Sequence, residues 1–296
     1  MSMAKKTSKL NGRLAVAKTY KIYIDGKFPR TESGRYFALE DAGGAVVANV
    51  CRASRKDFRN AVVAARKAQD AWAGASAYLR GQILYRIAEM LEGRRDQFVA
   101  ELRAQGVAPR AAQKETDASI DRLIYFAGWA DKYQQVFSSV NPVSSSHFNF
   151  SVLEPTGVVS VLAPEHSGLL GLISNIAPII VGGNTCVVLA SESLPLCAVS
   201  FAEVVHAADV PAGVVNILTG FRSELAGHFA SHMDVNAIIY CDGNRKLAKA
   251  VQTAAADNIK RVVPRTNLDW ARADVQHPYL IRDTQEVKTT WHPIGA

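Results

Sequence analysis

The sequence predicts an α/β fold in which helices flank a buried parallel β-sheet. Three runs rich in β-branched residues carry this prediction, at 158–162, 186–189 and 214–218. Each is bounded by turn residues and followed by a helical stretch, which is typical of strands buried on both faces. The chain has 296 residues, 48% of them hydrophobic, so it can bury a large core.

The first part of the chain predicts a leader and a hairpin. We expect residues 1–18 to be a disordered leader. Tyr20, Ile22 and Ile24 then alternate with polar or aromatic neighbours ahead of Asp25 and Gly26, a dipeptide that favours a tight hairpin turn.

Helices are expected next. Ser54 and Asp57 have the spacing of a capping box, which favours a helix start at this point. Apolar residues at helical spacing predict further helices over 77–92, 94–105 and 111–136.

A projecting arm is expected around residues 147–154, where apolar residues alternate as in an exposed edge strand. An unpaired apolar edge is an aggregation hazard, so we expect this strand to be paired within an oligomer. Its apolar face would be Phe148, Phe150 and Val152, and the far end of the chain offers four more apolar residues for a C-terminal strand: Tyr279, Ile281, Val287 and Trp291.

Composition limits the classes of function. The net charge of +7 and pI of about 9.2 raise the possibility of a basic nucleic-acid-binding scaffold. The basic residues are nevertheless scattered among acids, without a run interleaved with aromatics, which favours a solvated surface. The sequence has no apolar run of membrane-spanning length and no secretory signal, so we expect a cytoplasmic protein with no membrane partner.

Neither the cysteines nor the histidines indicate a metal site. The four cysteines lack CxxC spacing and fit the pattern of small buried apolar groups. His228 and His232 have the spacing of a helical ligand pair, but no third ligand lies near them in the sequence, so we expect no zinc.

Five short blocks together resemble the aldehyde dehydrogenase family, in that family's order and nearly its spacing. They are GVVSVLAP from Gly157, the segment 176–178, GGNT at 182–185, PAGVVNILTG at 211–220 and NIKRV at 258–262. The resemblance implies a Rossmann-like dinucleotide-binding-type domain over 19–268, which includes the arm strand 147–154. Residues 269–296 would be a short linker and the C-terminal oligomerisation strand.

The resemblance also implies that residues serving chemistry have been replaced. The family's oxyanion-hole amide falls on His166, which would donate differently. A histidine in a turn before a helix is more often satisfied by backbone groups. The lysine and glutamate that hold the adenosine ribose fall on Ala190 and Ser193, which cannot make the charged or bidentate bonds.

The pyrophosphate turn is degenerate as well. It falls on Tyr240, Cys241, Asp242 and Gly243, and the glycine four residues later falls on Leu247. A shift of the alignment by one residue rescues Gly243 but places Ala248 at that second glycine. An aspartate at a helix start competes with phosphate for the same donors. Asp242 is also a suitable helix N-cap, worth about 1 kcal/mol.

The position of the general base falls on Arg265, which stays protonated and is expected to form an ion pair instead. After Leu268 the family continues into a catalytic domain with the cysteine nucleophile, whereas here a short linker leads to the C-terminal strand. The chain is therefore similar to the cysteine-less second half of two-module aldehyde dehydrogenases.

Three hypotheses follow. The favoured one is a non-catalytic protein, without a cofactor, that assembles with itself or stabilises a full-length aldehyde dehydrogenase through its arm. The alternative is an NAD- or NADP-dependent oxidoreductase acting on an aldehyde with an altered site, for which Cys241 or a partner's cysteine would have to be the nucleophile. The third is the basic nucleic-acid-binding scaffold.

Overall fold

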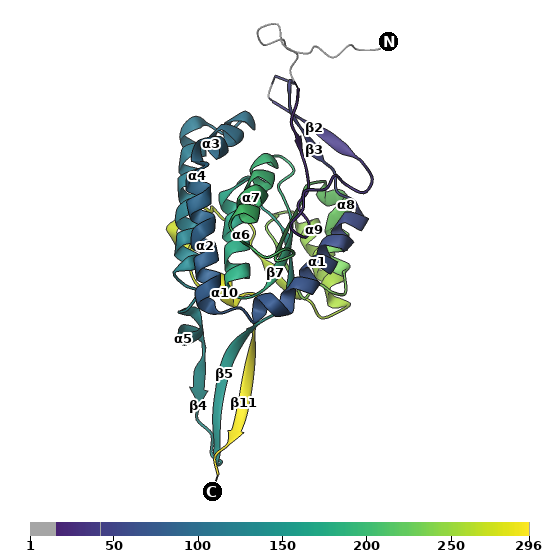
Figure 1. Cartoon of the computed structure of the whole chain (residues 1–296). Helices are drawn as coiled ribbons and strands as arrows, with labels where there is room; N and C mark the ends of the chain where they lie inside the picture. The colour runs from purple at the N-terminus through teal and green to yellow at the C-terminus, as the bar shows by residue number, and fades with distance from the viewer. Residues whose placement is uncertain (1–15, 42, 296) are drawn as a thin grey trace.

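The computed structural model describes residues 16–41 and 43–295 (Figure 1). Its centre is a five-stranded parallel sheet with the order β10-β9-β6-β7-β8. The strands are β6 (Val158–Leu162), β7 (Thr185–Leu189), β8 (Val215–Leu218), β9 (Ala237–Tyr240) and β10 (Arg261–Pro264). The three β-branched runs of the sequence are β6, β7 and β8, so the predicted α/β fold is confirmed.

Helices cover both faces of the sheet (Figure 1). The face that includes Val159 and Val161 packs against α2, α4, α6 and α7, and the face that includes Val158 and Leu162 packs against α1, α8 and α9. Four of these helices connect the strands: α6 (Leu170–Val181), α7 (Leu196–Ala207), α8 (Arg222–Ser231) and α9 (Arg245–Ala256).

The helices before the sheet agree closely with the sequence prediction, apart from one break. They are α1 (Arg55–Ala73), α2 (Ala77–Glu92), α3 (Arg95–Ala104), α4 (Pro109–Ala127) and α5 (Tyr133–Phe137). The capping box of Ser54 and Asp57 is present. The single helix predicted over 111–136 is wrong, because α4 ends at Gly128 and a turn separates it from α5.

The predicted N-terminal hairpin is reduced to its turn. Asp25 and Gly26 have φ of 52° and 70°, and Ile24 bridges Lys27. The strand before the turn does not alternate, because Ile22, Tyr23 and Ile24 are all buried. A separate sheet of order β1-β3-β2 contains β1 (Thr19–Tyr20), β2 (Tyr36–Glu40) and β3 (Val46–Cys51). Most of the predicted leader lies outside the described residues.

The two edges of the central sheet are protected differently. At β8, Tyr23 and Ile217 exchange two backbone hydrogen bonds of 2.8 Å. At β10, the backbone N–H groups of Arg261 and Arg265 donate to carbonyls on the β9 side of the strand. Backbone N–H groups alternate in direction along a strand, so the backbone nitrogen of Pro264 points to the open edge. Proline has no N–H group to offer there, and an edge strand is where a sheet tolerates it.

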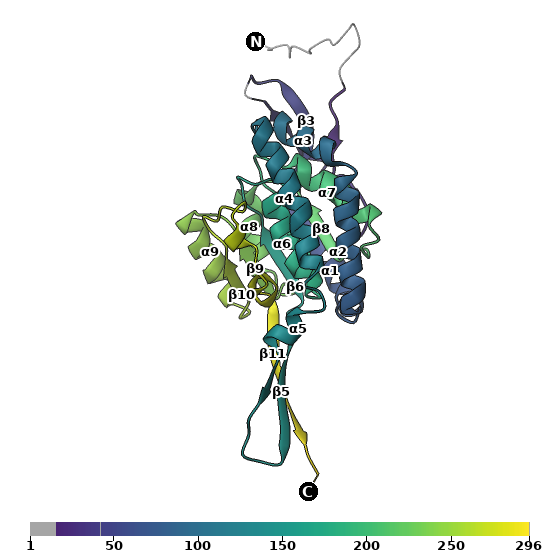
Figure 2. The ribbon, with the colours of Figure 1, turned by 90° about the vertical axis from the view of Figure 1, so that its left-hand side faces the viewer.

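The arm is the third sheet of the described chain, and it is antiparallel and projects from the domain (Figures 1 and 2). Its order is β11-β5-β4, with β4 (Ser139–Asn141), β5 (His147–Pro155) and β11 (Gln285–Pro293). The expected pairing of the arm strand with a C-terminal strand is confirmed within one chain. Tyr279 and Ile281 were wrongly assigned to that strand: they lie in α10 (Tyr279–Arg282), which follows the 3-10 helix Ala273–Val275.

The apolar residues predicted for the arm lie on opposite faces of it. Phe148, Phe150 and Val152 point to one face, because side chains alternate along a strand. Trp291 pairs with Asn149 and Val287 pairs with Leu153, so these four belong to the other face. The register therefore places the apolar residues of β5 and those of β11 on opposite faces of the arm.

The second face of the arm carries a network of polar side chains. The Nδ2 atom of Asn141 donates to Oδ1 of Asn149 at 2.6 Å and to Oγ of Ser151 at 2.9 Å. The hydroxyl of Ser151 in turn lies 2.8 Å from that of Thr289 on β11. The network therefore links all three strands of the arm.

None of the helices in the described part of the chain is long and apolar enough to cross a bilayer.

Lys260 yields a pH-dependent prediction. Its ammonium is buried and donates to the carbonyls of His232 and Val235 at 2.8 and 2.7 Å, and burial lowers its pKa to about 8. Because the unfolded chain holds this proton up to about pH 10.5, the free energy of unfolding contributed by Lys260 should rise by about 2 kcal/mol from pH 8 to pH 10.

Denaturant unfolding across this pH range should show the rise in the unsubstituted protein and in an exposed-lysine control, Lys249→Met. The variant Lys260→Met should lack it. An equal pH slope in all three proteins would contradict the prediction.

Candidate functional site

The candidate site lies at the carboxyl edge of the central sheet. The chain runs from β6 outward to β8 and then returns to β9 on the other side of β6, so β6 and β9 flank a topological switch point. Ligands in open parallel sheets bind at such a point. Two cavities of about 790 Å³ each open here, and both are lined by Glu165 and Asp242.

An ion-pair cluster stands between the two cavities. The guanidinium of Arg222 lies 2.6 Å from Glu165 and 3.1 Å from Asp242, measured from Nε and Nη1 to the carboxylate oxygens. It also donates to the carbonyl of Ala163, and its backbone N–H donates to Glu192. Arg222 is only 7% exposed, so its charge is held inside the protein. We call Glu165, Arg222, Asp242 and Glu192 the cleft cluster.

The carboxylates of the cleft cluster accept hydrogen bonds from backbone N–H groups that would otherwise be available to a ligand. A carboxylate oxygen of Glu165 accepts the backbone N–H groups of Glu192 and Ser193 at 2.9 and 3.2 Å. Asp242 accepts the N–H of Asn244 at 2.7 Å. The cluster has three carboxylates for one guanidinium, so its electrostatic field opposes phosphate groups in this cleft.

Helix α9 does not present a free N-terminus to the cleft. The side chain of Asn244 accepts the N–H groups of Lys246 and Leu247 at 2.9 and 3.2 Å. The N-cap is therefore Asn244, and the expectation that Asp242 caps this helix is wrong. Asp242 pairs with Arg222 instead, because the chain is extended at Asn244 and α9 begins only at Arg245.

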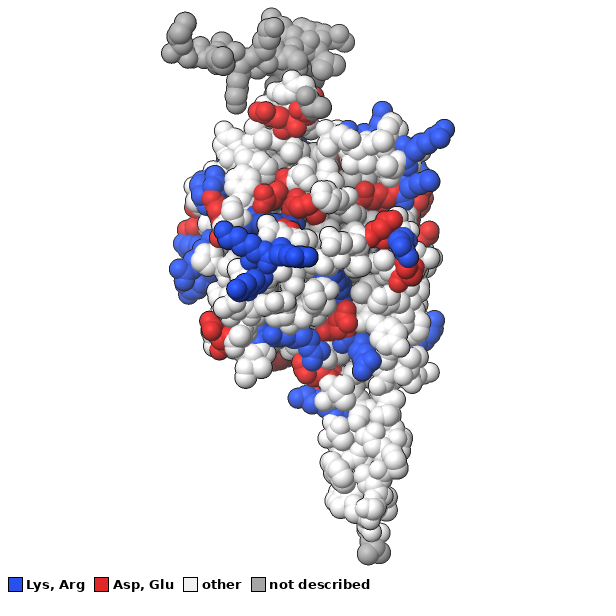
Figure 3. Space-filling view, turned by 180° about the vertical axis from the view of Figure 1, so that it is seen from behind, with Lys and Arg blue, Asp and Glu red and all other residues white. Residues whose placement is uncertain are grey.

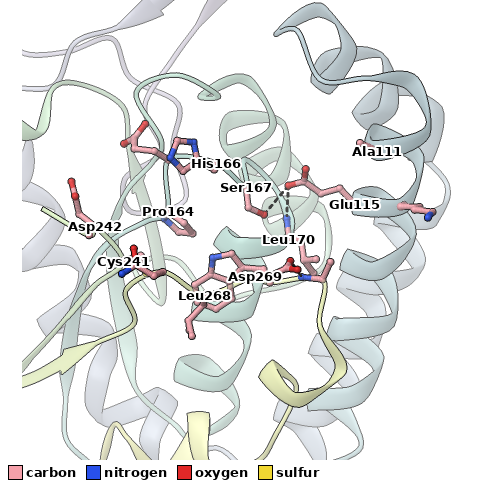
Figure 4. Close-up of a pocket in the computed structure, with 16 residues that line it drawn as sticks. Ala111, Glu115, Pro164, His166, Ser167, Leu170, Cys241, Asp242, Leu268 and Asp269 are labelled. Atoms are coloured by element: carbon pink, nitrogen blue, oxygen red, sulfur yellow. Dashed lines mark hydrogen bonds between the residues drawn. The ribbon is translucent and has the colours of Figure 1, made fainter.

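Helix α6 is capped from α4. Figure 4 shows Glu115 reaching Ser167 and Leu170 across the first cavity. Its Oε1 atom accepts the hydroxyl of Ser167 at 3.0 Å and the N–H groups of Leu169 and Leu170 at 3.0 and 3.2 Å. A glutamate thus accepts the hydrogen bonds of donors at the start of α6.

His166, at the predicted oxyanion position, lies beside this cap and lines the first cavity. Its side chain is exposed and makes no hydrogen bond to another described residue. The expectation that backbone groups satisfy this histidine is wrong, because the loop directs the ring outward toward solvent.

Cys241 is unsuited to nucleophilic attack. Its thiol is buried against Asn175, with Sγ 3.8 Å from Oδ1. Burial raises the pKa of Cys241 to about 12, although Arg265 and Arg222 act in the opposite direction. The thiolate is the reactive form, so this cysteine is inert near neutral pH.

Arg265 lies away from both cavities. It is buried and donates from Nη1 to Asn175 at 2.9 Å and from Nη2 to the carbonyl of Leu280 at 3.2 Å. Its 2.9 Å contact with Asp283 confirms the ion pair expected from the sequence. This arginine therefore fastens the segment 265–284 to α6 and has no access to a substrate.

The remaining residues that the resemblance aligns with the family's cofactor-binding positions do not lie together. Ala190 is buried at the end of β7, whereas Ser193, Gly243 and Leu247 line the cavities. No group of three or more metal-ligating side chains occurs among the residues described. For His228 and His232 on and after α8, burial is the main cause of a lowered pKa.

Arg222 and Glu115 were missed by sequence reasoning. Neither belongs to a motif, and each meets its partners only through the tertiary fold. The sequence offered one signal, an arginine directly after the Gly-Phe turn that ends β8. That signal is too general to identify the cleft cluster.

Comparisons with known proteins agree on one family. The model of the aldehyde dehydrogenase family matches residues 29–265. The chain is 35% identical over 253 residues to a 2-hydroxymuconic semialdehyde dehydrogenase of Pseudomonas sp. (strain CF600), covering 83% of this chain and 51% of that protein. It is 33% identical over 269 residues to retinal dehydrogenase 2 of Mus musculus, covering 87% and 51%.

A solved NAD+ complex of an aldehyde dehydrogenase from Bacillus cereus is similar in fold. It superposes with a TM-score of 0.80 at 26% identity and covers 84% of this chain and 51% of that one. The chain therefore spans about half the length of these relatives.

Arg265 should matter for stability. Replacing it with Ala leaves Asn175, the carbonyl of Leu280 and the carboxylate of Asp283 without their donor. We expect a loss of about 3 kcal/mol in the free energy of unfolding, at the lower end of the range for a broken buried pair because Asp283 is partly exposed. Denaturant unfolding measures it, with the neighbouring exposed Arg282→Ala as control. Equal stability of the two variants would contradict the assignment.

Proposed function

Because this chain belongs to the aldehyde dehydrogenase family, we propose that it is a non-catalytic member that acts as an oligomerisation or stabilising partner of a full-length aldehyde dehydrogenase. The observation that carries the proposal is the contrast between a paired three-stranded arm and a cleft whose two cavities are separated by the protein's own ion pairs. The arm pairs nine residues of β11 with β5, while Arg222 and its carboxylates occupy the cleft.

The route of the chain between β10 and β11 also supports the proposal. Residues 265–284 connect the two strands directly, and they contain only a 3-10 helix and α10. No nucleophile reaches the candidate site from this segment, and Cys241 is buried. The domain therefore provides a folded core and an arm, and the only thiol that lines its described cavities, that of Cys241, is buried.

The arm is the surface that would contact the partner. Phe148 is 44% exposed on one face, and Trp291 and Val287 are 57% and 58% exposed on the other. A sheet only three strands wide with apolar side chains exposed on both faces is suited to being covered by another subunit. A homo-oligomer would use the same arm.

Assembly is tested by co-expression with catalytic aldehyde dehydrogenases from the same cell, followed by affinity purification and a dehydrogenase assay. We expect co-purification with one of them and a more stable or more active partner. The double variant Phe148→Asp and Phe150→Asp should lose the partner, because a buried unpaired charge is costly.

Tyr36→Asp is the control, since it places one such charge at an exposed aromatic on β2, away from the arm. The proposed role would be refuted if the double arm variant still co-purified with the partner. It would also be refuted if no catalytic relative co-purified with the unsubstituted protein.

The second candidate is an NAD- or NADP-dependent oxidoreductase acting on an aldehyde, and it is favoured by the solved relative that holds NAD+. The cleft cluster argues against it. Thermal shift and calorimetric titration with millimolar NAD and NADP should show no binding, because a ligand of the native state raises the melting temperature by mass action. Saturable binding of either nucleotide in these measurements would favour the enzyme instead.

A further inference from the structure

The first cavity of the candidate site, the one that His166 lines, contains more negative than positive charge. Its charged lining side chains are four carboxylates and one ammonium group: Glu115, Glu165, Asp242, Asp269 and Lys114. Arg222 adds a second cation through its contacts with Glu165 and Asp242. Four carboxylates against two cations leave an excess of two negative charges, so the cavity opposes an anion and attracts a cation.

This acidic cavity contrasts with the rest of the molecule. The whole chain has a net charge of +7, and Figure 3 shows Lys and Arg side chains spread over one face of the domain with acidic groups between them. Charges in water are screened over a Debye length of about 8 Å at physiological ionic strength. The carboxylates therefore act on a cation held inside the cavity, despite the positive charge of the protein as a whole.

The carboxylates are spread around the cavity. Figure 4 shows Asp242 and Glu115 on opposite sides of it, and no group of three or more metal-ligating side chains occurs in the described part of the chain. Apolar side chains of Pro164, Leu170 and Leu268 line the walls. An occupant that matches this lining combines a positive charge with an alkyl body, which is the chemistry of an organic amine.

Trp270 supplies a hydrogen-bond donor that has no partner in the protein. The residue lines the cavity, is only 5% exposed and is held by Arg122, which donates to its backbone carbonyl at 3.0 Å. Its indole N–H makes no hydrogen bond to another described residue, and its nitrogen is not enclosed by protein atoms. Trp72, which is buried to a similar extent, donates its N–H to the carbonyl of Ile180 at 2.9 Å. A buried indole N–H usually has such a partner, so that of Trp270 is available to an acceptor in the cavity.

We propose that the first cavity binds a small organic cation, an alkylamine that also carries an oxygen acceptor such as an amide carbonyl. The carboxylates attract the ammonium group, the alkyl chain lies against the apolar walls, and the oxygen accepts the indole N–H of Trp270. The cavity volume of about 790 Å³ lies within the range of about 300–1,000 Å³ that is usual for small-molecule sites.

This inference goes beyond the proposed assembly and does not rest on it. The arm joins the domain at the amino end of β6, where β5 ends at Pro155, whereas the cavity opens at the carboxyl end of β6. Amine binding is measured on the chain alone, and assembly is measured by co-purification. Failure of either idea therefore leaves the other standing.

Isothermal titration calorimetry of the full chain at low ionic strength tests the proposal. The probe is N-acetylputrescine, which has one ammonium group and one amide oxygen. The control compound is N,N′-diacetylputrescine, which keeps the amide oxygen and has no charge. We expect saturable binding of the probe and at least about tenfold weaker binding of the control compound, because only the probe pairs with the carboxylates. The proposal is overturned if the probe shows no saturable binding at millimolar concentration, or if both compounds bind equally.

A pair of aspartate variants tests the location of the site. Asp269→Asn removes one charge from the cavity and keeps the side-chain oxygen that accepts the N–H of Ala271. It should weaken binding of N-acetylputrescine about fivefold, as loss of one charged contact does. Asp274→Asn is the matched control, because Asp274 pairs with the exposed Arg272 and does not line the cavity. Equal affinities of the two variants would show that the amine binds elsewhere.

Trp270→Phe tests the hydrogen-bond donor. The variant should bind N-acetylputrescine about fivefold more weakly than the unsubstituted protein, as loss of one hydrogen bond does. Putrescine has no oxygen acceptor, so both proteins should bind it alike. A purely structural role of Trp270 would lower the affinity for both compounds. Circular dichroism and thermal melting confirm that the variants fold. An equal loss for the two compounds, or no loss for N-acetylputrescine, contradicts the role of the indole N–H.

Discussion

Two buried guanidinium groups hold the end of the chain against the core, and the rest of the architecture depends on them. Arg122 on α4 donates to Ser174, to Gln276 and to the carbonyl of Trp270 at 2.6, 3.0 and 3.0 Å. Arg265 fastens the same segment further along through Leu280 and Asp283. Because β11 begins directly after this segment, the two arginines set where the third strand of the arm starts. Burial lowers the pKa of Arg122, so its hydrogen bonds must compensate for desolvation.

The cleft cluster has the opposite effect, because it makes a cleft unfavourable for an anionic ligand. A helix N-terminus favours an anion by about 0.3–1 kcal/mol at an exposed site. Two like charges about 4 Å apart repel by about 4 kcal/mol at an effective dielectric constant of 20. With Glu165, Asp242 and Glu192 around a single guanidinium, the cluster carries an excess of negative charge that opposes a pyrophosphate. Removal of Arg222 would strengthen that repulsion, since it is the cluster's only cation.

Local signals in the sequence predicted local structure well. The capping box at Ser54 and the β-branched strands depend on neighbours in the chain, and these elements form as expected. Tyr279 and Ile281 were misplaced because a short apolar run fits a helix or a strand equally well, and only its packing decides. The cleft cluster depends on residues that the fold brings together from three loops and the start of α8. Periodicity carries no information about such a set, so the sequence named Asp242 as a candidate but not the ion pairs that it forms.

The arm shows how one short sheet satisfies two requirements. The face that carries Trp291 and Val287 also links the three strands through hydrogen bonds of Asn141, Asn149 and Ser151. This leaves the apolar face with Phe148 free for contact with another chain. The polar side chains therefore connect the strands of a projecting sheet whose distal part, residues 138–153, contains no Lys, Arg, Asp or Glu.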